Sequence, residues 1–137
     1  VINYTKDNFA KEVMKITDNK GVSAVFDGVG KKTFHGSLAC LKTRGMMISF
    51  GNASGPLDPV DVPKDIQPKG LYLTRPSIAQ YFTNRKELQD GADKIFEKIK
   101  FGKIKIRISK KYKLAEAKQA HADLEARKLL GPAILIP

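Results

Sequence analysis

The sequence contains a single cysteine, Cys40, and only two histidines, His35 and His121. One cysteine cannot form an internal disulfide and fits a reducing compartment, so we expect a cytoplasmic protein. Cys40 lies in the apolar segment LACL, where a buried, inert thiol is expected and a reactive thiol is the alternative. The two histidines are far apart and lack partners at metal-ligand spacing, so no metal site is predicted.

Long apolar runs are also missing. Lys, Arg or Asp interrupts every candidate before it reaches the ~20 residues of a membrane-spanning helix, so no membrane association is predicted. The chain begins without methionine, inside an apolar, strand-like segment, which we interpret as a piece of a longer polypeptide. Its 137 residues are still enough for one domain with a hydrophobic core.

Acidic residues are scarce, because 14 Asp and Glu stand against 25 Lys and Arg, a formal net charge of +11. Such an excess can attract polyanions and support salt-sensitive binding to nucleic acid. The basic residues are spread along the chain, and the densest cluster, residues 98–113, alternates with isoleucine as a half-buried strand does. Solvated lysine faces are the favoured interpretation and an anion-binding surface is the alternative. No RNP-type aromatic motif or Cys/His module is present.

Apolar and amphipathic segments alternate, which is typical of a layered α/β fold. Near-continuous apolar runs indicate strands covered on both faces, as in a parallel sheet. They predict strands at residues 1–4, 22–27, 46–50 and 71–74. Helical spacing predicts helices from Thr5 or Asp7 to about residue 20, over residues 31–42, and from Thr83 or Asn84 to Gly102. Residues 53–70 hold four of the seven prolines and are predicted to be a loop.

Residues 103–137 follow a different pattern. They predict a strand at residues 104–108, a helix over residues 115–127 and a last strand at residues 133–137. His121 lies on a helix stripe with alanine and leucine. We therefore expect it to be a packed histidine, and a catalytic base is the alternative.

Two of the predicted strands end in glycine-containing turns, FDGVG (residues 26–30) and FGNASG (residues 50–55). Ligands of open parallel sheets bind beyond the carboxyl ends of the strands, where glycine permits close backbone approach. Asn52 and Ser54 add short polar side chains that can reach a ribose or phosphate. The spacing is neither a Walker loop nor GxGxxG, since Thr33 stands at the third glycine position. The motifs alone leave a nucleotide site and ordinary strand-to-helix turns as alternatives.

Several segments, in order along essentially the whole chain, resemble the C-terminal part of quinone oxidoreductases, the zeta-crystallin-like branch of the medium-chain dehydrogenase/reductase superfamily. The segments are VINY, VSAVFDGVG, FHGSLACLKTRGMMISFGNASG, LYLTRP and AHADLEARKLLGPAILIP. The resemblance implies that residues 1–102 form strands three to six of a doubly wound Rossmann sheet that binds NADPH. It also implies that residues 103–137 are a strand–helix–strand tail belonging to a GroES-like catalytic domain absent from this chain.

The family transfers a hydride from NADPH to a quinone without zinc. The resemblance therefore implies a fragment of a zinc-independent NADPH:quinone oxidoreductase, inactive or weakly active by itself, in a homodimer formed through the sixth Rossmann strand. The alternatives are a basic module with weak binding to AU-rich RNA and a non-catalytic dimerising remnant.

The resemblance also implies cofactor-binding positions. Tyr4 matches a tyrosine near the adenosine 2′-phosphate, and the SFGN turn approaches the nicotinamide half. Thr74 and Arg75 match a strand end near the carboxamide, and Arg127 matches an arginine that faces the cofactor. The residues expected to bind NADPH are Tyr4, Gly28, Phe50, Gly51, Asn52, Ser54, Thr74, Arg75 and Arg127.

Gly28 and Asp27, in the turn at residues 26–30, are not expected to take part in catalysis. Gly28 stands where the family commonly has serine, which removes one side-chain hydrogen bond. Asp27 is expected to organise the turn, and a chemical role is the alternative. No residue is assigned to catalysis, because the family's substrate-side tyrosines lie in the absent domain.

Overall fold

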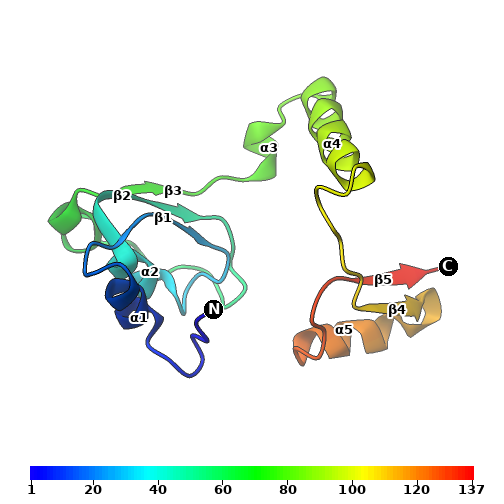
Figure 1. Ribbon diagram of the computed structural model, residues 1–137, viewed down its shortest axis with the longest axis horizontal. Coiled ribbons are helices and arrows are strands. Elements are labelled where there is room, and N and C mark those ends of the chain that lie inside the picture. The colour runs from blue at the N-terminus through cyan, green and yellow to red at the C-terminus, as the bar shows by residue number, and fades with distance from the viewer. The chain divides into compact units, whose positions relative to one another are not determined.

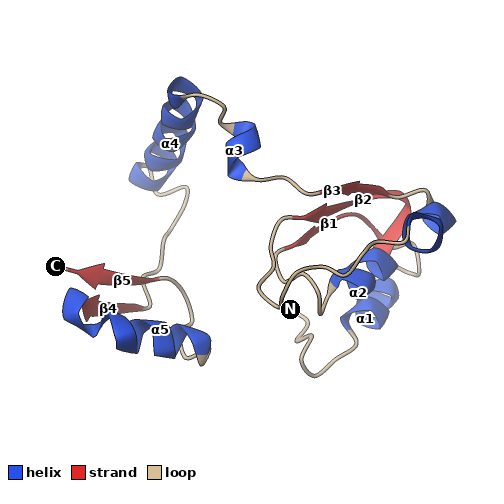
Figure 2. Ribbon diagram, turned by 180° about the vertical axis from the view of Figure 1, so that it is seen from behind, coloured by secondary structure: helices blue, strands red, loops and turns tan.

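The computed structural model describes residues 1–137 and divides into two compact units, Val1–Tyr81 and Phe82–Pro137. Figures 1 and 2 show the elements of both units from opposite sides. The domain boundary implied by the resemblance, between residues 102 and 103, concerns a longer protein and stays a prediction. In this chain, the helix that precedes that boundary clusters with the residues that follow it.

A parallel sheet forms the centre of the first unit. Its strands β1 (Val22–Asp27), β2 (Leu41–Ser49) and β3 (Tyr72–Thr74) lie in the order β1-β2-β3, and both pairings are parallel. Helices α1 (Phe9–Ile16) and α2 (Phe34–Cys40) lie on one face of this sheet (Figure 2). The predicted α/β class with a parallel sheet is confirmed, as are three of the four strands predicted for it.

The hydrophobic core lies between α2 and the sheet. Its buried members are Phe34, Leu38, Leu41, Met47 and Leu71. Phe34, Leu38 and Leu41 recur at helical spacing in the sequence, and this spacing predicts the buried face. The helix is shorter than the predicted residues 31–42, because Leu41 already begins β2. Cys40 is 3% exposed, in agreement with the buried thiol that was expected.

Two predictions for the N-terminal segment are wrong. Residues 1–4 form no strand. A strand needs a hydrogen-bonded neighbour, and these residues have none, because the sheet ends at β1, which pairs only with β2. The α1 helix is capped by Asn8 and not by Thr5 or Asp7. The Asn8 side chain accepts a hydrogen bond of 3.1 Å from the Lys11 N–H, which is the usual N-cap contact.

The connection from β2 to β3 is the long loop that was predicted from its prolines. It contains a π-helical turn, Val62–Ile66, and a 3-10 turn, Gln67–Lys69. A short helix that was not predicted, α3 (Ile78–Tyr81), follows β3.

The second unit contains one long helix and a parallel strand–helix–strand motif. Helix α4 (Arg85–Lys100) is capped by Asn84, one of the two residues predicted for this cap, through a 3.0 Å hydrogen bond from the Glu87 N–H. Strand β4 (Lys110–Lys113) pairs in parallel with β5 (Ala133–Ile136), and α5 (Ala117–Glu125) joins them after a 3-10 turn, Leu114–Glu116. None of the helices in residues 1–137 combines the length and apolar character that crossing a membrane requires.

Three predictions for this unit are wrong. The strand expected at residues 104–108 is irregular, and β4 lies later, where Tyr112 pairs with Leu135. The helical spacing of Leu88, Ala92, Ile95, Phe96 and Ile99 predicts a buried face of α4, but none of these residues is buried. His121, expected to be packed, is exposed and borders a groove within the unit. Alternation and helical spacing identify an apolar face, but the face is buried only where another element covers it.

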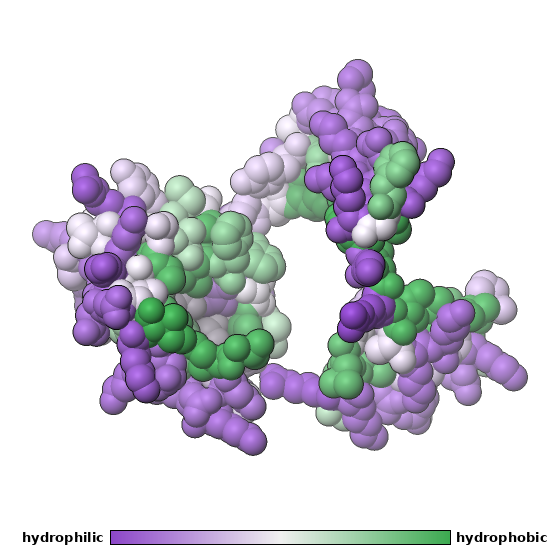
Figure 3. Space-filling view, in the orientation of Figure 1, coloured by the Kyte–Doolittle hydropathy of each residue, from purple (hydrophilic) through white to green (hydrophobic).

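Large apolar side chains remain exposed on both units. Figure 3 shows apolar atoms gathered on the surface of each. Phe26 and Phe50 of the first unit are 74% and 54% exposed, and Phe96 of the second is 65% exposed. Such surfaces are where partners or ligands of a protein bind.

Candidate functional site

Two turns at the carboxyl edge of the sheet form one hydrogen-bonded structure. The first turn (residues 27–30) follows β1, the second turn (residues 50–55) follows β2, and the pairing of Asp27 with Ser49 aligns the two strand ends. Four N–H groups of the second turn donate to carbonyl groups of the first. These bonds run from Phe50 and Gly51 to Asp27 (3.0 and 3.3 Å), from Ala53 to Gly28 (3.4 Å) and from Ser54 to Val29 (2.7 Å).

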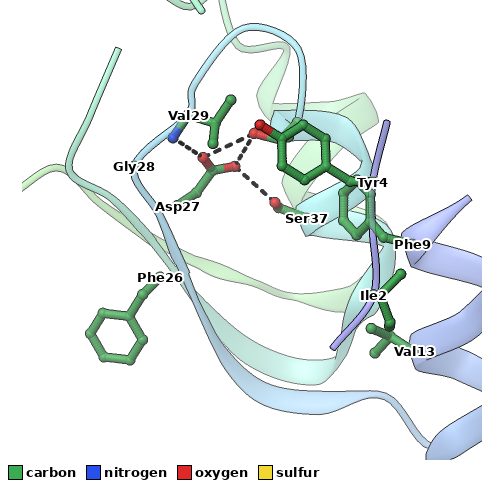
Figure 4. A pocket seen from close by; sticks show the side chains of 10 residues that line it. Ile2, Tyr4, Phe9, Val13, Phe26, Asp27, Gly28, Val29 and Ser37 are labelled. Carbon is green, nitrogen blue, oxygen red and sulfur yellow. Dashed lines mark hydrogen bonds between the residues drawn. The ribbon is translucent and has the colours of Figure 1, made fainter. Parts of the chain in front are cut away.

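The Asp27 side chain holds the first turn from inside (Figure 4). It is 4% exposed, and its Oδ1 accepts hydrogen bonds from the Val29 and Gly30 N–H groups at 2.8 and 2.9 Å. The hydroxyl groups of Thr33 and Ser37 donate to Oδ2, each at 2.8 Å. The carboxylate thus joins the end of β1 to the start of α2, which is the organising role expected for it.

Two opposed effects act on the pKa of Asp27. Burial raises this pKa, whereas the hydrogen bonds from Gly30, Ser37, Thr33 and Val29 together lower it below the ordinary value for aspartate. The side chain is therefore a carboxylate at neutral pH. A permanently ionised, internally bonded group suits a structural anchor and not a proton donor.

The glycines of the two turns make room for each other. A Cβ atom on Gly51 would overlap the Gly28 carbonyl, and one on Gly28 would lie 3.1 Å from the Phe50 ring. Gly30 has a φ of +87°, and a Cβ there would lie 3.0 Å from the Gly51 oxygen. The sequence reasoning expected close approach to a ligand, but the close approach that the structure contains is between the turns.

Ser54 and Asn52, both predicted to bind the cofactor, differ in how they are engaged. The Ser54 hydroxyl donates to the Val29 carbonyl at 2.7 Å and accepts from the Lys32 N–H at 2.9 Å, so one lone pair is left for another donor. The Asn52 side chain is exposed on the second turn. Asn52 is therefore more available to a ligand than Ser54, whose hydroxyl already links the two turns.

Thr74 and Arg75 extend this edge of the sheet to the third strand. Thr74 ends β3, opposite Ile48 of β2. The Arg75 Nη1 donates to the Ser49 carbonyl at 3.1 Å and to the Ser49 hydroxyl at 3.3 Å. Ser49 is fully buried, so it holds one end of the guanidinium and leaves the other nitrogen donors for a ligand.

A cavity of about 270 Å³ lies beside the first turn. Ligand pockets typically have volumes of ~300–1,000 Å³, so this one can take part of a dinucleotide but not all of it. Tyr4 lies on its wall close to Asp27 and Ser37, and Phe26 points away on the other side of β1 (Figure 4). The lining residues are Ile2, Tyr4, Phe9, Val13, Phe26, Asp27, Gly28, Val29, Thr33 and Ser37.

The structure therefore brings eight of the nine predicted site residues into the first unit, on the two turns, on the end of β3 and in the adjoining cavity. The ninth, Arg127, belongs to the second unit. It follows α5 with a φ of +54°, and its N–H donates to the Leu124 carbonyl at 3.0 Å. Whether these nine residues bind NADPH stays a prediction.

Sequence reasoning missed the partners of two buried carboxylates. Thr33, at the N-cap of α2, and Ser37 within the helix are four residues apart, a spacing that could have marked them as a pair. Asp123 is 5% exposed and accepts hydrogen bonds from Tyr112 (2.7 Å), Lys110 (3.1 Å) and Gln119 (2.9 Å). These bonds hold the pKa of Asp123 well below its usual range. Only the four-residue spacing of Gln119 and Asp123 was visible in the sequence.

No group of three or more His, Cys, Asp and Glu side chains in residues 1–137 is arranged to bind a metal ion. The residues of this chain therefore do not provide a ligand set for zinc.

Comparisons with known proteins match the whole chain. The sequence model of a family described as zinc-binding dehydrogenase matches residues 1–135. The chain is 42% identical over 99% of its length to a quinone oxidoreductase of Pseudomonas aeruginosa and 43% identical over 100% to one of Salmonella typhimurium. It is 39% identical over 99% of its length to a 2-haloacrylate reductase of a Burkholderia species. It covers 42%, 42% and 41% of these relatives, so it spans about two fifths of their length.

Solved structures also match the chain along its whole length. An Escherichia coli quinone oxidoreductase complexed with NADPH matches with a TM-score of 0.93 at 41% identity, over 100% of this chain and 43% of that one. A mycobacterial protein complexed with NADPH matches with a TM-score of 0.89 at 42% identity, over 100% and 43% of the two chains. These similarities confirm the resemblance to quinone oxidoreductases and the Rossmann-type α/β fold class.

Proposed function

The chain belongs to the zinc-binding dehydrogenase family, and we propose that it is part of an NADPH-dependent quinone oxidoreductase. The observation that carries the proposal is the similarity along the entire chain to quinone oxidoreductases, at about two fifths identity and with a TM-score of 0.93 for one NADPH complex. The proposal includes that these 137 residues are a fragment of a longer polypeptide.

The carboxyl edge of the sheet fits part of NADPH. Parallel sheets bind ligands at this edge, and here the two turns are fixed to each other before any ligand arrives. Preformed turns reduce the ordering that binding requires. NADPH supplies a hydride, and the residues of this chain bind and orient the molecule that carries it. The residues proposed for this are Tyr4, Gly28, Phe50, Gly51, Asn52, Ser54, Thr74, Arg75 and Arg127.

Arg75 has the most defined role in this proposal. Its guanidinium is held on one side by Ser49, and its remaining N–H groups can donate to a carbonyl or phosphate oxygen of the ligand. Phe50, 54% exposed beside Gly28, offers a ring face for stacking. No side chain of the site is proposed as a proton donor, because its one carboxyl group is an internally bonded carboxylate.

Zinc takes no part in the proposed reaction. The residues of this chain do not fit a zinc ion, since no cluster of three suitable side chains exists among residues 1–137. Hydride transfer without zinc is part of the proposal because the resemblance implies it, and activity of the complete polypeptide after exhaustive dialysis against a chelator tests it. Unchanged activity is expected, and loss of activity restored by zinc would contradict it.

The proposal extends to a quinone substrate, a homodimer and a cytoplasmic location. The dimer would form through β3, which ends the sheet and exposes Tyr72 (60%) and Leu73 (40%). The single cysteine is consistent with the cytoplasm. The comparisons favour a reductase over the RNA-binding alternative, because the relatives reported above are named as reductases.

NADPH oxidation by the complete polypeptide tests the proposed function. We expect it to oxidise NADPH with a benzoquinone as acceptor, and the 137-residue chain to bind NADPH weakly in a fluorescence titration. If NADPH were oxidised with a 2-haloacrylate but with no quinone, the proposed quinone substrate would be wrong and the proposed NADPH cofactor would still stand. Failure to oxidise NADPH with either acceptor would overturn the proposed function.

A further inference from the structure

The first turn already contains an anion, its own Asp27 carboxylate. Successive N–H groups after a strand are the donors with which glycine-rich turns hold phosphate. Here the N–H groups of Val29 and Gly30 point at Asp27 Oδ1, at 2.8 and 2.9 Å. The hydroxyl groups of Thr33 and Ser37 complete the shell at 2.8 Å each.

We infer that Asp27 determines which part of a dinucleotide the first turn can take: it occupies the anion position, excludes a phosphate and leaves the turn to an uncharged group. The inference rests on the proposed function for the identity of the ligand. It does not rest on that function for the exclusion of phosphate, which follows from the donors alone.

Saturation of the donors is the first argument. A phosphate needs several N–H or O–H donors, and each of the four groups around Asp27 already donates to it. A phosphate that took these donors would leave a buried carboxylate, 4% exposed, without partners. An uncompensated buried charge is strongly unfavourable, so the internal carboxylate prevails.

Charge is the second argument. Asp27 is ionised at neutral pH, and a phosphate brought against the same turn would meet a like charge at short range. Lys31, which follows the turn, does not offset this charge because its ammonium group pairs with Asp58 at 2.7 Å. The turn therefore repels anions although the chain as a whole carries a net charge of +11.

The adjoining cavity gives a third reason, because its lining suits an uncharged ring. Tyr4 also lines this cavity, so in this inference it lies beside that ring and not beside the adenosine 2′-phosphate, as the resemblance implied. Ile2, Phe9 and Val13 contribute apolar side chains to the lining. The polar groups around Asp27 are committed to the internal hydrogen bonds. Pockets of this kind bind apolar ligand surface and use few polar groups to orient it.

Asp27 is also a positioning residue for the second turn. Its backbone carbonyl accepts the N–H groups of Phe50 and Gly51, at 3.0 and 3.3 Å. One residue therefore fixes the first turn through its side chain and the second through its main chain. Both turns carry residues proposed to contact the cofactor.

Amide NMR of the 137-residue chain tests the exclusion of phosphate. In the native chain, we expect inorganic phosphate to leave the Val29 and Gly30 signals in place, and dihydronicotinamide riboside, an uncharged probe, to shift them. In Asp27→Ala, phosphate should shift the two signals with an affinity about tenfold or more higher, the effect of removing one close like charge. Equal phosphate shifts in the native chain and in Asp27→Ala would overturn the inference.

Ser37→Ala is the matched control, because it removes one donor to Asp27 and keeps the carboxylate. It should gain no phosphate binding, and a gain equal to that of Asp27→Ala would overturn the inference. If Asp27→Ala is too unstable for NMR, its melting temperature is measured with and without formate or phosphate and compared with that of the native chain. Stabilisation by these anions beyond that of the native chain supports the inference, and its absence overturns it.

The proposed function has a separate test, and it is wrong if the complete native polypeptide does not oxidise NADPH. In that case the phosphate result at the first turn still stands.

Discussion

Lys69 shows how one side chain can complete a helix that is remote in sequence. Its ammonium group donates to the carbonyls of Leu38 (3.4 Å), Ala39 (2.9 Å) and Leu41 (2.7 Å) at the end of α2. The last carbonyls of a helix have no partner within the helix, and a cation there also interacts favourably with the negative end of the helix dipole. Burial raises the pKa of the neighbouring Cys40 thiol, and Lys69 offsets that effect only in part. The thiol is therefore protonated and inert at neutral pH.

Replacing Lys69 with methionine should destabilise the first unit. The change keeps the apolar stem and removes charge-assisted hydrogen bonds, so the free energy of unfolding should fall by about 1.5–3 kcal/mol. Urea unfolding followed through the amide signals of α2 measures it. Lys64→Met, in the same loop and exposed, is the control. An equal loss in both variants would show that the contact with α2 contributes nothing.

Arg127 combines an unfavourable backbone conformation with a proposed role in binding. Its φ of +54° follows the end of α5, a position at which glycine is the usual residue. Arg127→Gly should therefore raise the free energy of unfolding by about 1 kcal/mol. The NADPH affinity of the complete polypeptide should fall about tenfold, since a charge-assisted contact is lost. Melting curves and NADPH titrations measure the two effects.

Arg44 provides a matched control for that experiment. It is exposed and has a φ of +61°, but it lies outside the proposed site. Arg44→Gly should stabilise the chain in the same way and leave NADPH binding unchanged. Equal NADPH affinity in both glycine variants would contradict the role proposed for Arg127.

At the scale of elements, the strand–helix–strand motif of the second unit depends on one buried carboxylate. A two-stranded sheet has marginal stability by itself. Asp123 of α5 joins the helix to β4 through Tyr112 and Lys110, and it also lies 3.5 Å from the Lys128 ammonium group after the helix. Its hydrogen-bond and ion-pair partners therefore connect β4, α5 and the segment that leads to β5.

This network makes the second unit sensitive to acid. The hydrogen bonds from Tyr112, Lys110 and Gln119 lower the pKa of Asp123 in the folded chain. A lowered folded-state pKa contributes stability that is present above the unfolded value of about 3.9 and is lost as the pH falls toward the folded value. Circular dichroism on acidification should show unfolding of the second unit below about pH 4, with a smaller pH dependence in Asp123→Asn. Identical acid transitions in the two proteins would contradict this.

The elements that the sequence predicted are those whose signals are local. Apolar runs predicted β1, β2 and β3, the pair Thr83 and Asn84 predicted the start of α4, and glycine predicted both turns. The missed features depend on partners far along the chain. Residues 104–108 alternate like a strand, but β5 pairs with residues 110–113 instead. For the site, the turns were predicted from glycine spacing, whereas the contact of Arg75 with Ser49, across 26 residues, left no pattern in the sequence.

At the scale of the whole molecule, each unit exposes apolar side chains and sheet edges that no other element covers. β1 and β3 both end the sheet, and each has one paired side only. In the second unit, Ile95 and Phe96 of α4 are 52% and 65% exposed. The chain covers about two fifths of the length of its relatives. Under the proposal that it is part of a longer protein, further polypeptide or a second copy covers these apolar faces.

The exposed edge at β3 makes self-association the most direct outcome to test. Light scattering at increasing concentration should detect dimers or larger species of the 137-residue chain. Leu73→Lys, which places a charge on this edge strand, should shift the population toward monomer, because edge charges oppose pairing between sheets. Leu130→Lys adds the same charge at a fully exposed position in the second unit and should leave association unchanged. A native chain that stays monomeric, or an equal response of both variants, would show that β3 is not the contact.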